Sequence, residues 1–226
     1  MTEHTNYQQL AEGEIGMLNC KDQNFDKRLI PIGIPVGISN RHVHLTQQDL
    51  DELFGSNHQL TAFKKLSQPG EYASQEVVTL VGPRGVLEGV RILGPPRSYS
   101  QIEISMTDAY RIGLRPPVRD SGELAGTPGI AIVGQKGAQA LKEGVILAAR
   151  HIHMSPAQAK ELGVQKGDKV LVYVNGKRGC ILENVLIRVH EKFVLEMHID
   201  TDEANCSLIK NGDEVHIVRN GNILLQ

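Results

Sequence analysis

Short runs of apolar residues, many of them β-branched, recur along the chain between turn-forming residues and predict a protein rich in β-strands. The predicted strands are Val77–Val81, Lys169–Val174, Val185–Val189, Phe193–Ile199 and Val215–Val218. Two of these runs end at Asn-Gly, a pair that is typical of tight hairpin turns. Many short strands with few helical segments favour small β-barrels over a doubly wound parallel sheet.

One segment occurs twice. Arg41–Leu53 reads RHVHLTQQDLDEL and Arg150–Leu162 reads RHIHMSPAQAKEL. In each copy the Arg-His-x-His unit leads into a predicted helix, for which Thr46 and Ser155 are the expected N-caps. The strand-like runs that precede the two copies are Ile34–Ser39 and Val145–Ala148. The shared order of strand, His-x-His and capped helix predicts an internal repeat.

A weaker correspondence extends the repeat. Leu87-Glu-Gly-Val resembles Leu182-Glu-Asn-Val, and the same count from each glutamate leads to Glu103 and His198. Both residues lie between apolar neighbours of a predicted strand, so we interpret them as equivalent positions. The expected fold is therefore mainly β, with two β-barrels related by the repeat and capped by short helices.

Composition narrows the classes of function. The chain has 226 residues, of which 40% are apolar and 22% charged, with a net charge of −2. One large or two smaller globular domains are expected, without the basic surplus typical of nucleic-acid binding. Apolar stretches fall far short of the roughly 20 residues that span a bilayer, and Met1–Phe25 lacks a signal-like apolar region. We therefore expect a cytoplasmic protein with neither nucleic acid nor membrane as partner.

The repeated histidines carry the candidate chemistry. On a strand, the two imidazoles of a His-x-His unit point to the same face. This applies to His42 with His44 and to His151 with His153, and the same reasoning adds Glu103 and His198. Imidazole and carboxylate ligands together suit zinc or a similar divalent ion.

Arginines near these residues suggest an anionic substrate. Arg97 lies six residues before Glu103, so it is a candidate anion-binding residue, although it could also solvate a loop. For Arg41 and Arg150, anion binding and structural salt bridging are both open. A glycine-rich phosphate loop, a Ser-His-Asp order and a dinucleotide fingerprint are absent from the sequence. Two alternatives stay open, namely a dinuclear metallohydrolase of thioesters or phosphoesters and a non-enzymatic metal-binding β-barrel protein.

Longer motifs resemble a known family. They are SNRHVHL from Ser39, ILGPPRS from Ile92, QIEIS from Gln101, RHIHMSP from Arg150 and LEMHIDTDEAN from Leu195. Together they are similar to phosphate propanoyltransferases, the zinc-dependent phosphotransacylases of bacterial propanediol utilisation and microcompartments. The resemblance implies two β-barrels with an exchanged N-terminal strand. The expected units are residues 1–29 as an extension, 41–148 as the first barrel, and 30–40 plus 149–226 as the second.

The same resemblance implies the roles of the site residues. His42 and His44 would bind one zinc ion, and Glu103, His151, His153 and His198 would bind a second, giving two Zn²⁺ per chain. Arg97 matches the arginine that contacts phosphate. The implied partners are coenzyme A or a short-chain acyl-CoA, and inorganic phosphate. A second copy of the chain and a microcompartment shell are further candidate partners, and the extension is either an encapsulation peptide or a plain tail.

Overall fold

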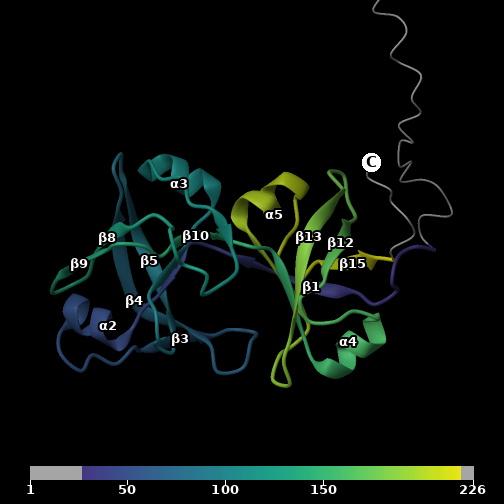
Figure 1. Ribbon diagram of the computed structural model, residues 1–226, viewed down its shortest axis with the longest axis horizontal. Helices are drawn as coiled ribbons and strands as arrows, with labels where there is room; N and C mark the ends of the chain where they lie inside the picture. Colours follow the sequence, from purple (N-terminus) through teal and green to yellow (C-terminus); the bar gives the residue numbers. More distant parts are fainter. Residues whose placement is uncertain (1–26, 220–226) are drawn as a thin grey trace, which may run out of the picture.

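The computed structural model describes residues 27–219 and contains two β-rich units that lie side by side (Figure 1). The mainly β class expected from the sequence is confirmed. Residues 1–26 of the predicted extension lie outside the described residues, so its role as an encapsulation peptide stays a prediction. In the described part of the chain, no helix combines the length and apolar character needed to cross a bilayer.

The second unit is a closed barrel of six strands in the order β1-β14-β11-β13-β12-β15. The strands are β1 (Ile34–Ser39), β11 (His151–Met154), β12 (Lys169–Val174), β13 (Cys180–Val189), β14 (Glu196–Asp200) and β15 (Glu214–Val218). The predicted strand Phe193–Ile199 begins later than expected. Residues 190–193 instead form a turn, in which the Phe193 N–H donates to the His190 carbonyl at 3.0 Å.

The first unit is a curled sheet whose strands follow an open path, β7-β10-β6-β2-β5-β4-β8-β9, with β3 paired to β4. Its strands are β2 (His42–His44), β3 (Ala62–Lys65), β4 (Tyr72–Val81), β5 (Val86–Gly94), β6 (Gln101–Glu103), β7 (Val118–Arg119), β8 (Ile130–Val133), β9 (Ala138–Leu141) and β10 (Val145–Ala148). Only the second unit therefore closes into a complete barrel.

Four short helices accompany the sheets. They are α2 (Gln47–Phe54), α3 (Met106–Ile112), α4 (Pro156–Leu162) and α5 (Thr201–Ser207). The predicted N-caps are confirmed, since the side chains of Thr46 and Ser155 accept hydrogen bonds from the backbone N–H groups of Asp49 and Gln158. Each cap lies shortly after a histidine pair, so the strand that carries the pair ends there and the helix begins.

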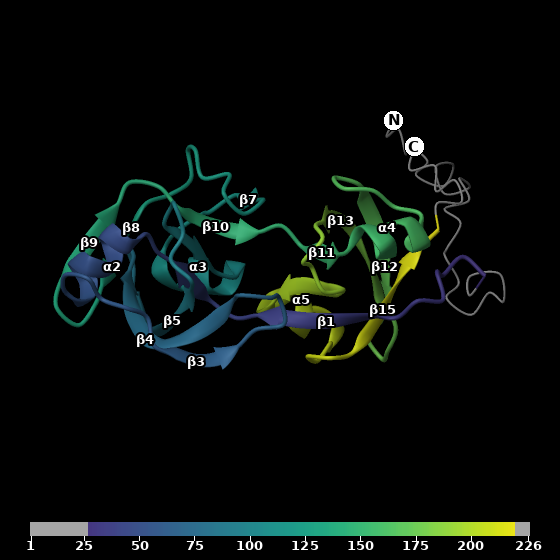
Figure 2. The ribbon, with the colours of Figure 1, turned by 90° about the horizontal axis from the view of Figure 1, so that it is seen from below.

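The strand before each histidine pair belongs to the other unit's sheet. β1 leads into β2 of the open sheet but pairs with β14 and β15 of the barrel. β10 leads into β11 of the barrel but pairs with β6 and β7 of the open sheet. Figure 2 shows the two segments that join the units, after β1 and after β10; at residues 40–41 and 149–150 each segment leads directly into a histidine pair. The exact domain boundaries stay a prediction.

Each unit has its own apolar core. In the barrel, Ile34, Ile152 and Met197 are completely buried together, and in the open sheet Val43, Ile92 and Ile102 are completely buried. Four of these side chains, Val43, Ile102, Ile152 and Met197, occupy strand positions directly next to the histidines or Glu103. Burial of one face therefore directs the polar set to the opposite face.

Replacing Ile34 by alanine tests the place of β1 in the barrel core. Because Ile34 is 0% exposed, the cavity left by Ile34→Ala is expected to lower the free energy of unfolding by about 2–5 kcal/mol. The control Val118→Ala, at a side chain that is 60% exposed, is expected to change it by less than about 0.5 kcal/mol. Urea denaturation measures both. Equal midpoints for the two variants would contradict this placement.

Candidate active site between the two units

All six predicted ligand residues and Arg97 line one cavity of about 100 Å³. Its wall comes from both units, since β2 and β6 belong to the open sheet whereas β11 and β14 belong to the barrel. The full lining is Ser39, His42, His44, Leu66, Glu71, Leu93, Arg97, Glu103, Ser121, Ala148, His151, His153, Arg188 and His198. The structure therefore brings these seven residues to one cavity, and their roles as metal ligands and anion-binding residue stay predictions.

Two groups of side chains could each hold a metal ion and are called the ligand groups; the first consists of His42, His44 and Glu103. β2 and β6 pair antiparallel with His42 directly opposite Glu103, so strand register alone brings the carboxylate to the imidazole. The Nε2 atom of His42 lies 3.5 Å from Glu103 Oε2, and that of His44 lies 3.9 Å from Glu103 Oε1. One carboxylate thus faces two imidazoles.

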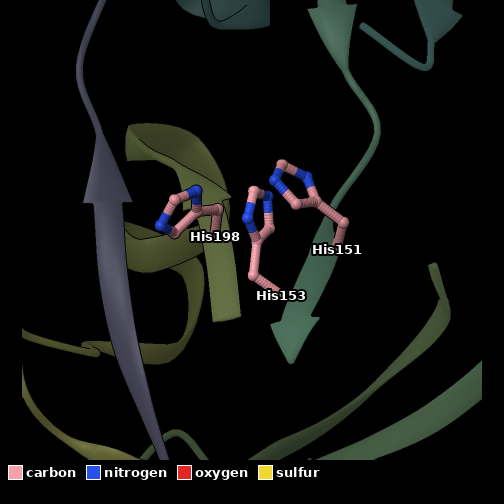
Figure 3. Close-up of side chains that lie close together, drawn as sticks. All are labelled: His151, His153 and His198. Carbon is pink, nitrogen blue, oxygen red and sulfur yellow. The ribbon is translucent and has the colours of Figure 1, made fainter. Parts of the chain in front are cut away.

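The second group consists of His151, His153 and His198. β11 and β14 pair antiparallel with His151 opposite His198, the same register as in the first group. The ring centroids of His153 lie 4.7 Å from those of His151 and 5.0 Å from those of His198. Figure 3 shows the three rings gathered beside one another. The register agrees with the predicted equivalence of Glu103 and His198.

The spatial grouping of these side chains differs from the expected division of ligands, which stays a prediction. Resemblance assigned two ligands to the first ion and four to the second, with Glu103 in the larger set. In the structure Glu103 instead groups with His42 and His44, giving three residues in each group. The reason is the β2–β6 pairing, which places Glu103 next to the histidines of its own unit.

Charge and burial act together in the first group. Burial acts to lower the pKa of His42, but attraction and hydrogen bonding to Glu103 outweigh it and hold this pKa above the ordinary value. Burial acts to raise the pKa of Glu103, but His42 and His44 hold it well below its usual range. Burial and the nearby positive charges of His42 and Arg97 lower the pKa of His44 to about 3. Glu103 is therefore ionised and His44 neutral at pH 7.

Two imidazoles of the second group, those of His151 and His153, are held neutral by their surroundings. Burial and repulsion from neighbouring imidazoles lower the pKa of His151 to about 4 and that of His153 to about 3. Both ring nitrogens of His153, and Nδ1 of His44, are buried without a hydrogen-bond partner among residues 27–219. Such unpaired buried nitrogens are costly, and neutral imidazole is the form that binds metal. The donor set therefore fits a divalent metal in each group.

Backbone carbonyls orient the first histidine of each pair. Nδ1 of His42 donates to the carbonyl of Asn40, and Nδ1 of His151 donates to that of Ala149, each at 2.8 Å. A carbonyl can only accept, so the neutral imidazole keeps its proton on Nδ1 and has its lone pair on Nε2, where a metal would bind. This arrangement is typical of metal-binding histidines.

The arginines between these groups make salt bridges. Arg41 forms two contacts with Asp108 on α3, at 2.7 and 2.8 Å. Arg150 forms one with Glu203 on α5 at 2.9 Å. Of the two roles left open by the sequence, the structure therefore supports salt bridging for both.

Arg97 reaches the cavity from the segment between β5 and β6. Its backbone N–H donates to the Leu45 carbonyl at 2.9 Å. Its guanidinium donates to Glu71 Oε1 at 3.1 Å and to Ser121 Oγ at 3.3 Å. These contacts hold a half-buried cation beside the first ligand group, where it can bind an anion.

Sequence reasoning missed Glu196 beside His198. Glu196 Oε2 lies 2.6 Å from His198 Nε2, and the hydroxyl of Ser67 donates to the same carboxylate. The Gln68 side chain pairs with both the N–H and the carbonyl of Val194, at 3.2 and 3.0 Å. Residues 67–68 of the first unit thereby hold the segment that positions His198. The spacing of Glu196 and His198 on one strand face was the available signal.

A further set was missed in the loop after β7 and on β13. Arg188 contacts Asp120, and Gln101 donates to Ser121 Oγ at 2.9 Å and to Glu103 Oε1 at 2.6 Å. The sequence predicts only a Pro- and Gly-rich connecting loop at residues 115–128. For Arg188 the signal was a charged residue between the apolar residues of a predicted strand.

Fold and cavity together define a class of protein: two β-rich units that hold buried groups of metal-ligand side chains, with arginine beside them. The sequence pattern of the phosphate propanoyltransferase family matches residues 35–210. The chain is 57% identical to a phosphate propanoyltransferase of Thermotoga maritima, over 82% of this chain and 89% of the relative. It is 54% identical to one of Citrobacter freundii over 77% and 83%, and 47% identical to one of Rhodopseudomonas palustris over 86% and 86%.

The chain therefore belongs to the phosphate propanoyltransferase family, a family of acyltransferases.

Replacing Glu103 by glutamine tests the electrostatics of the first group. In metal-free Glu103→Gln, the pKa of His42 is expected to fall, because the attraction that outweighs burial is removed. The control Glu88→Gln, at an exposed residue outside the cavity, is expected to leave it unchanged. NMR titration of the imidazole resonances measures this pKa. An unaltered His42 titration in Glu103→Gln would contradict the assigned interaction.

Proposed function

We propose that this chain catalyses the reversible transfer of a short acyl group, propanoyl or similar, between coenzyme A and inorganic phosphate. The observation that supports this function is the cavity in which buried His/Glu groups from both units converge with Arg97, in a member of the phosphate propanoyltransferase family. Such a cavity brings ligands for a Lewis acid and a site for an oxyanion within reach of one another.

The reaction joins acyl-CoA and hydrogen phosphate. An oxygen of phosphate forms a bond to the carbonyl carbon of the thioester, and the carbon–sulfur bond breaks. The products are acyl phosphate and coenzyme A, whose thiol takes up the proton lost by hydrogen phosphate. Phosphate is itself the nucleophile, so a covalent acyl-enzyme is not needed.

The two ligand groups are proposed to hold one divalent ion each, with zinc as the ion that suits their imidazole and carboxylate donors. His42, His44 and Glu103 would hold one ion, and His151, His153 and His198 the other. Metal bound there supplies Lewis acidity, which polarises a thioester carbonyl and stabilises an anionic oxygen or sulfur. A metal held by the three residues of one group would keep a coordination position for substrate, as in catalytic rather than structural sites.

The chain's own residues complete the site. Arg97 is proposed to bind the phosphate oxygens, and its contacts with Glu71 and Ser121 keep the guanidinium oriented before substrate arrives. Gln101 and the opposing imidazoles hold the Glu103 carboxylate in place. Location between two packed units limits access of water, which would otherwise compete with phosphate for the thioester.

A phosphate-dependence assay tests this function. Acyl-CoA is incubated with the metal-loaded enzyme, and both thiol release and acyl phosphate are measured with and without inorganic phosphate. We expect thiol release only with phosphate, in equal amount to acyl phosphate. Thiol release that is equal with and without phosphate would identify a hydrolase instead. If no thiol is released under either condition, the result would favour a non-enzymatic metal-binding protein.

Metal content tests the three-plus-three division. His44→Ala and His153→Ala are each expected to reduce a ratio of two metals per chain to about one, since each change weakens one group. His44→Ala with Glu103→Gln affects a single group and is expected to stay near one, whereas His44→Ala with His153→Ala is expected to approach zero. Elemental analysis after identical dialysis measures the ratios. Loss of both metals from the first double variant would contradict the division.

Arginine replacement tests the phosphate site. By analogy with removal of one oxyanion-binding donor, Arg97→Ala is expected to lower phosphate-dependent turnover about 10²- to 10³-fold. Arg97→Lys keeps the charge but loses the planar fork, so partial activity is expected. The control Arg178→Ala lies at an exposed arginine outside the cavity and is expected to match the parent. Parental turnover in Arg97→Ala would exclude the assigned role.

A further inference from the structure

A second guanidinium faces the cavity that contains Arg97. Arg188 lies on β13, where it pairs in register with His153 of β11, and it lines the same cavity as both ligand groups. Its side chain is only 19% exposed. Burial lowers its pKa to about 10, which still leaves it charged at neutral pH. A buried cation at this place in the fold requires an anionic partner.

The partner within the chain is Asp120, whose carboxylate contacts the Arg188 guanidinium. Asp120 is followed by Ser121, which accepts the hydrogen bond from Arg97. Asp120 and Ser121 are adjacent in one loop. They therefore contact Arg188 of the barrel and Arg97 of the open sheet, respectively. Arginine has five N–H donors in a planar fork, so contact with one carboxylate leaves donors for a second anion.

The fold itself does not demand arginine at this position. On β13, Leu186 pairs with His151, and on β5 of the other unit, Arg91 pairs with His42. Two residues further along these strands lie Arg188 and Leu93. Leu93 is therefore the counterpart of Arg188. Leu93 lines the same cavity but is apolar. At equivalent positions of the cavity wall, the open sheet therefore has an apolar side chain and the barrel has a cationic one.

We propose that Arg188 binds the phosphate group of the substrate together with Arg97, so that each unit contributes one guanidinium to a shared anion site. This inference rests on the proposed phosphotransacylase function. Two guanidinium groups can balance the double negative charge of phosphate or acyl phosphate, which the cavity must accept beside the acidic side chains of Glu103 and Glu71.

Binding and kinetics of Arg188→Ala test the proposal. Isothermal titration calorimetry of the metal-loaded protein with inorganic phosphate gives Kd, and initial rates give KM for phosphate and for acyl-CoA. We expect Arg188→Ala to raise the Kd and KM for phosphate about 10- to 100-fold, the loss of a charge-assisted contact, while KM for acyl-CoA changes less than about threefold. Arg188→Lys is expected to be intermediate, and Arg178→Ala is the surface control.

A partner variant separates anion binding from a structural ion pair. Asp120→Asn removes the charge that faces Arg188 but keeps the guanidinium, so it is expected to retain phosphate affinity within about threefold of the parent. Far-UV circular dichroism and metal content are measured for every variant. If Arg188→Ala is insoluble, Arg188→Lys with parental metal content decides, because weaker phosphate binding is still expected there.

The outcomes are distinct. Parental phosphate affinity in Arg188→Ala, or in Arg188→Lys where only that variant is soluble, overturns the proposal. Loss of affinity in Asp120→Asn as large as in Arg188→Ala also overturns it, because Arg188 would then act only through the ion pair. A parent that binds phosphate through Arg188 but forms no acyl phosphate would refute the proposed function and leave the anion site supported.

Discussion

Strand register is the constraint on which the site depends. In both units an antiparallel pairing places the first histidine of a His-x-His pair directly opposite another ligand residue, Glu103 in one case and His198 in the other. The period of two along a strand then puts the second histidine on the same face. A shift of one residue in either pairing would turn these side chains toward the apolar core. The register that packs the core is therefore also the register that places the ligand residues in the cavity.

The exchanged connections bring the two ligand groups together. β1 and β10 each pair with the sheet of the other unit, and the short segments after them lead directly into the histidine pairs. Carbonyls in these segments, from Asn40 and Ala149, accept the Nδ1 protons of His42 and His151. The connection between the units therefore also determines which ring nitrogen is available in the cavity.

The two units share a pattern but differ in charge. Glu103 gives the first ligand group an ionised carboxylate, whereas the second group contains only imidazoles, of which His151 and His153 are held neutral by burial. On the neighbouring strands Leu93 corresponds to Arg188. The two groups thus share one strand register, whereas different residue types at corresponding positions give the two groups different charges.

The sequence by itself determined the β-rich class and the paired histidines, because these follow from local periodicity and a recurring motif. It also predicted the equivalence of Glu103 and His198, with which the strand registers agree. Tertiary structure alone decided that Glu103 groups with His42 and His44, because strand pairing joins residues about sixty positions apart. It also decided that Ser121 and Arg188 reach the cavity, since a loop's path and a strand's neighbours depend on long-range packing. The local sequence pattern specifies the strand face on which a side chain lies, whereas the tertiary fold specifies which residues contact that face.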